Sequence, residues 1–214
     1  LPEALDSNLI TLRKELRDMS SRAVGMLQAI EECARDDSRL ADVRKKLQSE
    51  EQFVDDMQEA ITEFLTDSIR VPISEEQAKN IQSMQRIANE IESISDSCFS
   101  IGMCFDKLRK KGWRLHDAAD EEIRAYTLQV LKFLDFNASL LAGDDGEVDL
   151  DHAFRMETGI DKSRNKLRKR SRRTIEHEKH PDVKGELTFI DIVRHLEHIG
   201  DYSLNISQAV AELS

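Results

Sequence analysis

Two pairs of carboxylates stand at matching places in the sequence. Glu197 and Asp201 lie four residues apart in the stretch RHLEHIGDYSLNI, and Glu92 and Asp96 have the same spacing in RIANEIESISDSCFSI, 105 residues earlier. Residues four apart in a helix share one face, so each pair places two negative charges side by side. These charges repel each other unless a cation binds between them. Each pair is therefore a candidate site for a metal ion.

A second set of pairs has nearly the same register. Glu51 and Asp55 precede Glu157 and Asp161 by 106 residues. A chain of 214 residues with 42 acids contains about eight acidic pairs at this helical spacing by chance, so one pair alone is uninformative. The agreement of four pairs in two registers is what favours metal binding. The acidic pattern continues beyond Asp55 to Asp67, as is typical of a solvated helix face, and this simpler explanation stays open.

The carboxylates lie on long amphipathic segments. Apolar residues recur at alternating spacings of three and four, as in helices that pack along their length against other helices. The pattern predicts six helices, over residues 5–33, 40–69, 75–109, 118–142, 149–179 and 186–213. Pro72, Gly112, the turn at residues 143–146 and Pro181 fall between them, where helices end.

The apolar positions of the third helix recur in the sixth. When the series from Ile87 onward is shifted by 105 residues, six of the seven positions are again apolar, with Ser203 as the exception. Long periodic helices that repeat in this way are typical of bundles. We therefore expect an all-α fold of six long helices in two pseudo-repeated three-helix bundles, residues 1–111 and 112–214.

The composition narrows the class of function. The formal net charge is −11 and the sequence pI is about 5.1, so the chain suits cations or basic partners and not nucleic acid. No apolar run reaches the roughly 18 residues that a membrane span needs. Cys33, Cys98 and Cys104 lack zinc-type spacing and are expected to be small buried thiols. No glycine-rich phosphate loop and no nucleophile elbow occurs, so neither a catalytic residue nor an organic cofactor is predicted.

The stretches that hold two of the pairs resemble the PhoU family. IANEIESISD and LEHIGDYSLNI carry the resemblance, and Leu196–Ile206 is its most specific part, whereas the other helices match by pattern. The first copy has Ser95 where the second has Gly200 in the I-G-D of the family. Family members have two three-helix bundles with a Glu/Asp-x-x-x-Asp pair on the second and third helix of each. These pairs hold metal ions, often several together, on the bundle surface.

The resemblance implies two metal sites in this chain. The residues of the first are Glu51, Asp55, Glu92 and Asp96, and those of the second are Glu157, Asp161, Glu197 and Asp201. All eight side chains offer oxygen ligands, which suit Mg²⁺, Mn²⁺, Ca²⁺ or iron better than a thiolate-type zinc site.

The resemblance also implies a regulator of phosphate transport and not an enzyme. One family context is the free-standing regulator of a phosphate ABC transporter and its sensor kinase. The other is the cytosolic C-terminal domain of Na⁺/phosphate cotransporter-like proteins, which the opening residues LPEAL and the missing start methionine favour. The expected partners are a membrane transporter, in the same chain or as a separate subunit, a sensor kinase and a second copy of the chain. The expected location is the cytoplasm, at the cytosolic face of the inner membrane.

Two other classes of function could use the same residues. A carboxylate-bridged metallohydrolase would show metal-dependent phosphatase activity, and a helical scaffold would bind no metal. His195 and His198 flank Glu197 and could add a nitrogen ligand, although surface or half-buried histidines explain them more simply. The basic run from Lys162 to Arg173 could meet phosphate groups, an anionic membrane or an acidic partner, or could pair with acids of neighbouring helices.

Overall fold

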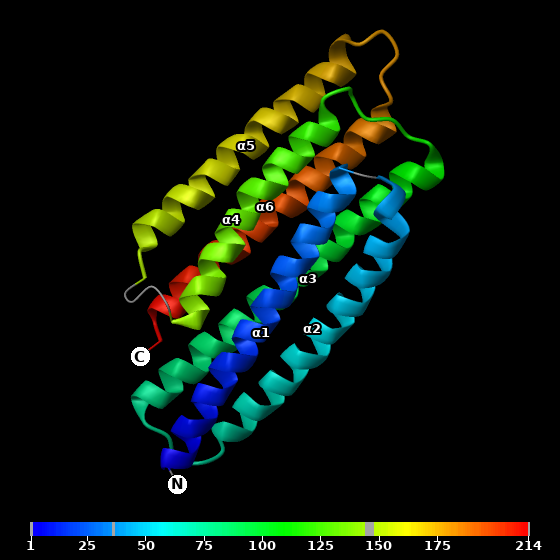
Figure 1. Ribbon diagram of the computed structural model, residues 1–214. Coiled ribbons are helices and arrows are strands. Elements are labelled where there is room, and N and C mark those ends of the chain that lie inside the picture. Colours follow the sequence, from blue (N-terminus) through cyan, green and yellow to red (C-terminus); the bar gives the residue numbers. More distant parts are fainter. Residues whose placement is uncertain (1, 36, 144–147, 214) are drawn as a thin grey trace.

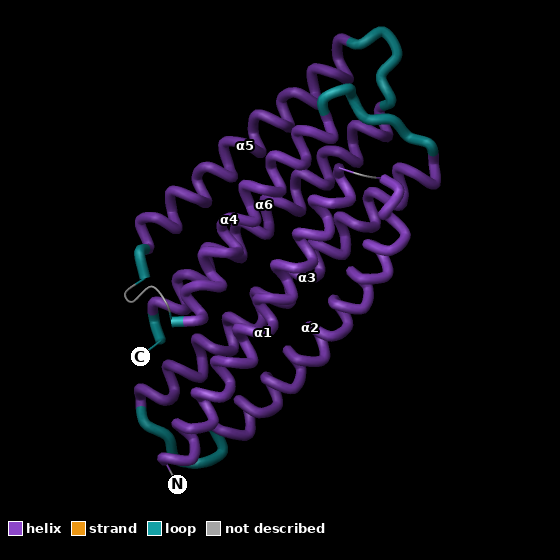
Figure 2. The backbone as a smooth tube through the Cα atoms, in the orientation of Figure 1, coloured by secondary structure: helices purple, strands orange, loops and turns teal. Residues whose placement is uncertain are grey.

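The computed structural model describes residues 2–35, 37–143 and 148–213. Over this part the chain forms six long α-helices and one short 3₁₀ helix, without a strand (Figure 2). The helices are α1 (Pro2–Arg35), η1 (Asp37–Arg39), α2 (Leu40–Ser68), α3 (Glu75–Lys111), α4 (Ala119–Ala142), α5 (Leu150–His177) and α6 (Val183–Ala211). Every predicted helix is present, and its ends lie within a few residues of the predicted ones. The prediction of an all-α fold with six long helices is confirmed.

The helices form two three-helix bundles that lie side by side (Figure 1). α1 packs on α2 and α3 in the first bundle, and α6 packs on α4 and α5 in the second. The bundles meet through α1 on α4 and α3 on α6. These four helices make a four-helix centre, and α2 and α5 cover its opposite flanks (Figure 1). One buried apolar cluster extends through both bundles. The predicted boundary at residues 111 and 112 falls at the end of α3, and a division into two domains there stays a prediction.

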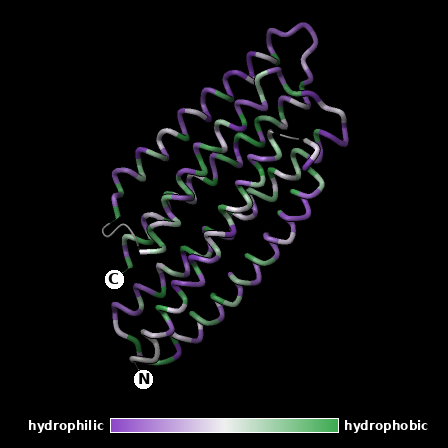
Figure 3. Tube along the Cα trace, in the orientation of Figure 1, coloured by the Kyte–Doolittle hydropathy of each residue, from purple (hydrophilic) through white to green (hydrophobic). Residues whose placement is uncertain are grey.

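The apolar spacing explains which helices are central. In α1 the predicted apolar series from Leu9 to Ile30 is buried. α5, in contrast, buries only Ala153, Ile160, Leu167 and Ser171 among its described residues. Hydrophilic residues accordingly predominate along α5 (Figure 3). A helix with so narrow a buried stripe packs on one side only, which is why α5 lies on a flank of the molecule.

The predicted helix ends have the expected local chemistry. The Ser74 Oγ accepts a hydrogen bond from the Gln77 N–H (3.1 Å), and the Gln77 side chain accepts one from the Ser74 N–H (3.1 Å), so α3 begins with a capping box. Gly112 ends α3 and Gly143 ends α4 with φ values of 63° and 79°, a conformation that favours glycine. The rest of the predicted turn at residues 143–146 lies outside the described residues.

The three cysteines lie within the helices α1 and α3. Cys33 and Cys98 are buried and Cys104 is half-buried. Burial raises the pKa of Cys98 far above its usual range, and burial together with Asp191 raises that of Cys104 to about 11. These two thiols therefore stay protonated at neutral pH. A search of the described helices for a long apolar stretch that could cross a membrane finds none.

Candidate metal centre

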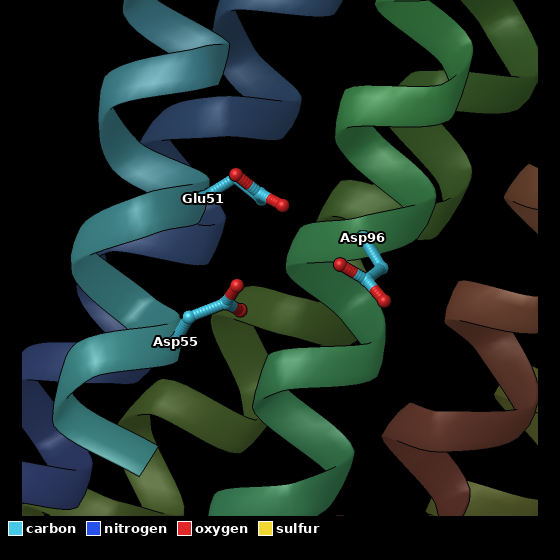
Figure 4. A group of neighbouring side chains, drawn as sticks. All are labelled: Glu51, Asp55 and Asp96. Carbon is cyan, nitrogen blue, oxygen red and sulfur yellow. The ribbon is translucent and has the colours of Figure 1, made fainter. Parts of the chain in front are cut away.

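The residues predicted for the first metal site lie close together where α2 packs on α3. Glu51 and Asp55 lie one turn apart on α2 and point toward Asp96 on α3 (Figure 4). One carboxylate oxygen of each residue lies within 4.8 Å of the other two. Oxygens that bind one Ca²⁺ ion at about 2.3–2.6 Å lie at most about 5 Å apart. The three side chains could therefore bind one cation together.

Glu92 lies one turn before Asp96 on α3, at the edge of this group. It is half-buried, and its Oε2 accepts a hydrogen bond from the Ser93 Oγ (3.2 Å). Burial and the charge of Asp96 raise the pKa of Glu92. The structure thus brings the four predicted residues of the first site to one seam. They are called the first cluster below: Glu51, Asp55, Glu92 and Asp96.

The first cluster has no compensating positive charge. Among the described residues, none of its four carboxylates forms an ion pair. Burial, followed by neighbouring carboxylates, raises the pKa of Glu51 and of Asp55. The Asp55 Oδ1 is buried and has no hydrogen-bond partner among the described residues. Such an oxygen costs about 1–3 kcal/mol of stability, and a bound cation would supply the missing partner.

The second set of predicted ligands meets in the same way between α5 and α6. One carboxylate oxygen each of Glu157, Asp161 and Asp201 lies within 4.8 Å of the other two. Glu197 lies one turn before Asp201, as Glu92 lies before Asp96. Burial and the charge of Glu197 raise the pKa of Asp201 to about 6. Glu157, Asp161, Glu197 and Asp201 are called the second cluster below. Metal binding by either cluster stays a prediction.

Arg164 enters the second cluster from α5. Its Nη1 forms an ion pair with the Glu197 Oε1 and lies 3.4 Å from the Asp161 Oδ1. The side chains of Arg164 and Glu197 are only 22% and 13% exposed, so the pair is largely shielded from water. The sequence does not predict this contact, because Arg164 is one of many basic residues in a run. The 106-residue register offers a signal, since the corresponding residue of the first half is the neutral Gln58.

The two histidines beside Glu197 do not join the close carboxylate oxygens. His198 Nε2 lies 3.8 Å from the Glu197 Oε2, and the imidazole rings of His195 and His198 contact each other edge to face. The His198 side chain is 41% exposed, and His195 is half-buried. This placement agrees with the simpler explanation of surface or half-buried histidines.

The remaining basic run lies mostly on the outer face of α5. Arg170 pairs with Glu122 on α4 (3.3 Å), and Arg172 lies 3.8 Å from Glu176 on its own helix. The other basic residues of the run, apart from Arg164, are exposed. Part of the basic run therefore pairs with acids of its own helix and of neighbouring helices. Pairing with acids of neighbouring helices was one of the alternatives that the sequence left open.

Ser95 takes the place of glycine without entering the first cluster. It is fully buried, and its Oγ lies 3.4 Å from the Met26 sulfur on α1. At Gly200, an added Cβ would lie 3.0 Å from the Ile160 Cγ2 on α5. The residue that corresponds to Ile160 in the first half is the smaller Val54. The close carboxylate oxygens occur in both halves, with serine at this position in one and glycine in the other.

A buried polar group that the sequence does not reveal lies where the linker enters the second bundle. The side chains of His116 and Glu186 are only 4% and 1% exposed. His116 Nδ1 lies 2.9 Å from the Glu186 Oε1, and His116 Nε2 lies 3.0 Å from the Glu122 Oε2. Ser171 donates a hydrogen bond to the Glu186 Oε2 (2.6 Å). The group joins the linker to α4, α5 and α6, and its members share no sequence period.

Comparisons with known proteins agree with this architecture. The family model described as the PhoU domain matches residues 119–210, which span α4 to α6 and the second cluster. A phosphate transport system regulatory protein, PhoU from Streptococcus pneumoniae, has a crystal structure that matches with a TM-score of 0.80 and 16% identity, over 98% of this chain and 96% of that chain. PhoU from Pseudomonas aeruginosa matches with a TM-score of 0.73 and 19% identity, over 99% of this chain and 95% of that chain. A search of the curated proteins finds no match. Residues 119–210 therefore match the PhoU domain model, and the whole chain has the fold of PhoU proteins.

Proposed function

We propose that this chain is a PhoU-type regulator of phosphate transport whose carboxylate clusters offer binding sites for metal ions. The regulatory role is supported by the match to the PhoU domain model at residues 119–210, within a chain that has the PhoU fold throughout. The matched protein from Streptococcus pneumoniae is itself described as a regulatory protein of the phosphate transport system. PhoU proteins are regulators and not enzymes, in agreement with the expectation from the sequence.

The free-standing regulator is the better supported of the two family contexts. Both matched structures are PhoU proteins, and the matches cover 96% and 95% of their chains. The cotransporter domain, which the opening residues favoured, is the less well supported alternative. We therefore place the protein in the cytoplasm, where it acts on a membrane phosphate transporter as a separate partner. The sensor kinase that accompanies such a transporter is the second expected partner.

The metal role is supported by the geometry and charge of the first cluster. Three carboxylate oxygens converge within 4.8 Å, and in the described part of the chain the buried Asp55 Oδ1 has no hydrogen-bond partner. Ligands that are all oxygens favour Mg²⁺, Mn²⁺, Ca²⁺ or iron. A bound cation would offset part of the negative charge of the carboxylates and connect α2 to α3. The residues present fit such an ion, since they supply negative charge and leave one buried oxygen to be satisfied.

The regulatory proposal is tested by deleting the gene in the organism that encodes it. Phosphate uptake and a phosphate-responsive reporter are measured in phosphate-rich medium, where a regulator of uptake has its effect. We expect the deletion to change both, and the wild-type gene to restore them. Uptake and reporter activity that are unaffected by the deletion would overturn the regulatory role.

The metal proposal is tested on the purified chain. The protein is stripped with a chelator, dialysed against Mn²⁺ and analysed for bound metal by mass spectrometry. We expect Asp55→Asn and Asp96→Asn to lose metal, with helix content unchanged by circular dichroism. Asp56→Asn is the matched control, because Asp56 is an exposed acid on α2 next to the cluster. Equal metal content in all three variants would refute the assignment.

The competing class, a carboxylate-bridged metallohydrolase, makes a different prediction. Such an enzyme would hydrolyse a phosphate ester in the presence of Mn²⁺ or Fe²⁺. Turnover that needs the metal and is abolished by Glu92→Gln would replace the regulatory proposal by an enzymatic one.

A further inference from the structure

The two clusters share their geometry but differ in charge. Each has three carboxylate oxygens within 4.8 Å of one another, and a fourth acid one turn away. The first cluster forms no ion pair among the described residues, and its Asp55 Oδ1 lacks a partner. The second cluster contains Arg164, which pairs with Glu197 and Asp161. A positive charge is therefore already present in one cluster and absent from the other.

Arg164 lies where it interacts with most of the second cluster. Its guanidinium contacts acids of both helices, Asp161 on α5 and Glu197 on α6. Its charge also acts on Glu157. A cation bound by the close oxygens of this cluster would lie within a few ångströms of the guanidinium, where like charges repel. Metal binding at the second cluster is therefore unfavourable while Arg164 keeps its present position.

Gln58 holds the corresponding place on α2 and leaves the first cluster uncompensated. It is neutral, and its Nε2 donates hydrogen bonds to the Thr62 Oγ1 (3.1 Å) and to the Asn89 Oδ1 (2.7 Å). These partners belong to a group of amides and hydroxyls between α2 and α3, not to the first cluster. The same register position thus supplies a cation in the second half and only a neutral amide in the first.

We propose that Arg164 is a built-in counter-ion of the second cluster, taking the place of a metal ion, so that metal binds to the first cluster in preference to the second. This inference rests on the metal binding proposed above and adds an asymmetry between the two clusters. A metal ion that enters the second cluster must first displace the guanidinium from Glu197 and Asp161. At the first cluster no ion pair has to be broken, and a buried oxygen gains a partner.

The first experiment compares the two clusters in the otherwise unchanged chain. Mn²⁺ binding to the metal-free protein is measured by titration calorimetry. We expect Asp55→Asn to abolish the tighter Mn²⁺ binding of the wild type. Asp201→Asn, the corresponding change in the second cluster, is expected to leave that binding unchanged in affinity and stoichiometry. This comparison needs no substitution of Arg164, so it decides the question even where an Arg164 variant fails to fold.

The second experiment exchanges the residues at the two register positions. Arg164→Gln copies Gln58 and is expected to tighten Mn²⁺ binding at the second cluster roughly tenfold or more. The reciprocal change, Gln58→Arg, is expected to weaken binding at the first cluster. Arg168→Gln is the matched control, because it removes the same charge from an exposed position on the same helix and is expected to change neither. Thermal unfolding confirms that each variant is folded.

The outcomes separate this inference from the proposed metal binding. Equal losses of Mn²⁺ in Asp55→Asn and Asp201→Asn would overturn the role of Arg164 and leave metal binding intact. A folded Arg164→Gln variant that binds Mn²⁺ no better than Arg168→Gln would do the same. A wild-type protein that binds no Mn²⁺ would overturn the metal proposal, and this inference with it.

Discussion

Removal of the Glu186 side chain is expected to destabilise the protein more than most single substitutions. Three donors converge on this buried carboxylate: the His116 N–H (2.9 Å), the His116 Nδ1 (2.9 Å) and the Ser171 Oγ (2.6 Å). Glu186→Ala leaves all three without this acceptor. The Glu186 side chain is only 1% exposed, so little water is at hand to replace it.

The magnitude follows from these contacts. Each buried donor left unpaired costs about 1–3 kcal/mol. With three donors affected, we expect Glu186→Ala to lower the free energy of unfolding by about 4 kcal/mol. In a chain of this size, 1 kcal/mol shifts the Tm by about 2–4 °C, so the Tm should fall by roughly 8–16 °C.

Thermal unfolding followed by circular dichroism measures this effect. Glu186→Gln keeps an oxygen that accepts from the His116 N–H, so its loss should be clearly smaller than that of Glu186→Ala. Glu59→Ala removes an exposed acid from α2 and should change stability by at most about 0.5 kcal/mol. A Tm for Glu186→Ala as close to the wild type as that of Glu59→Ala would refute the reasoning.

Three further predictions follow from other contacts. Gly185→Ala places a Cβ 1.9 Å from the Arg114 carbonyl oxygen, so we expect a clear fall in Tm, and an unchanged Tm would contradict that close approach. The pKa of Asp201 is raised to about 6, so its ionisation disfavours the folded state above this pH, and the penalty is lost as the pH falls toward the unfolded value near 4. Asp201→Asn should therefore raise the Tm of the metal-free protein more at about pH 7.5 than at about pH 4.5, whereas a gain independent of pH would argue against this sign. Cys98 and Cys104 should react slowly with iodoacetamide at about pH 8 in the native protein and rapidly after unfolding, as counted by mass spectrometry, and rapid native labelling would show that these thiols are accessible.

The helices and their arrangement could be predicted because they depend on periodic features. Spacings of three and four mark the packed face of each helix, and Ser74 and Gly112 mark helix ends through backbone chemistry that is local in sequence. The carboxylate pairs could be predicted for the same reason, since a helix of known register places Glu51 beside Asp55. The pairing of the helices in space can be determined only from the tertiary fold. In this structure, the pairing of α2 with α3 and of α5 with α6 agrees with the sequence repeat.

Contacts without a period could not be predicted. Arg164 looks like its basic neighbours until the packing of α5 on α6 directs it to Glu197. His116 and Glu186 are 70 residues apart, and nothing in the local sequence marks either as buried. Charged residues in a sequence with 34% charged residues are mostly on the surface. The few charged residues that are buried are determined by the packing around them and by their interaction partners, and residue spacing alone does not predict these.

The position of α2 and α5 on opposite flanks has a consequence for local unfolding. Either helix can separate from the four-helix centre without opening the other, because α2 and α5 do not pack on each other. On the proposals above, Arg164 joins the acids of α5 and α6 with a charge that belongs to the chain, whereas the acids of α2 and α3 are joined only while an ion is bound. A ligand that binds only the state in which a helix is packed lowers the population of the state in which that helix has separated. The rate of amide hydrogen exchange in α2 would then depend on the concentration of free metal, whereas the rate in α5 would not. The stability of one flank of the molecule would thus vary with metal concentration, and that of the other flank would stay constant.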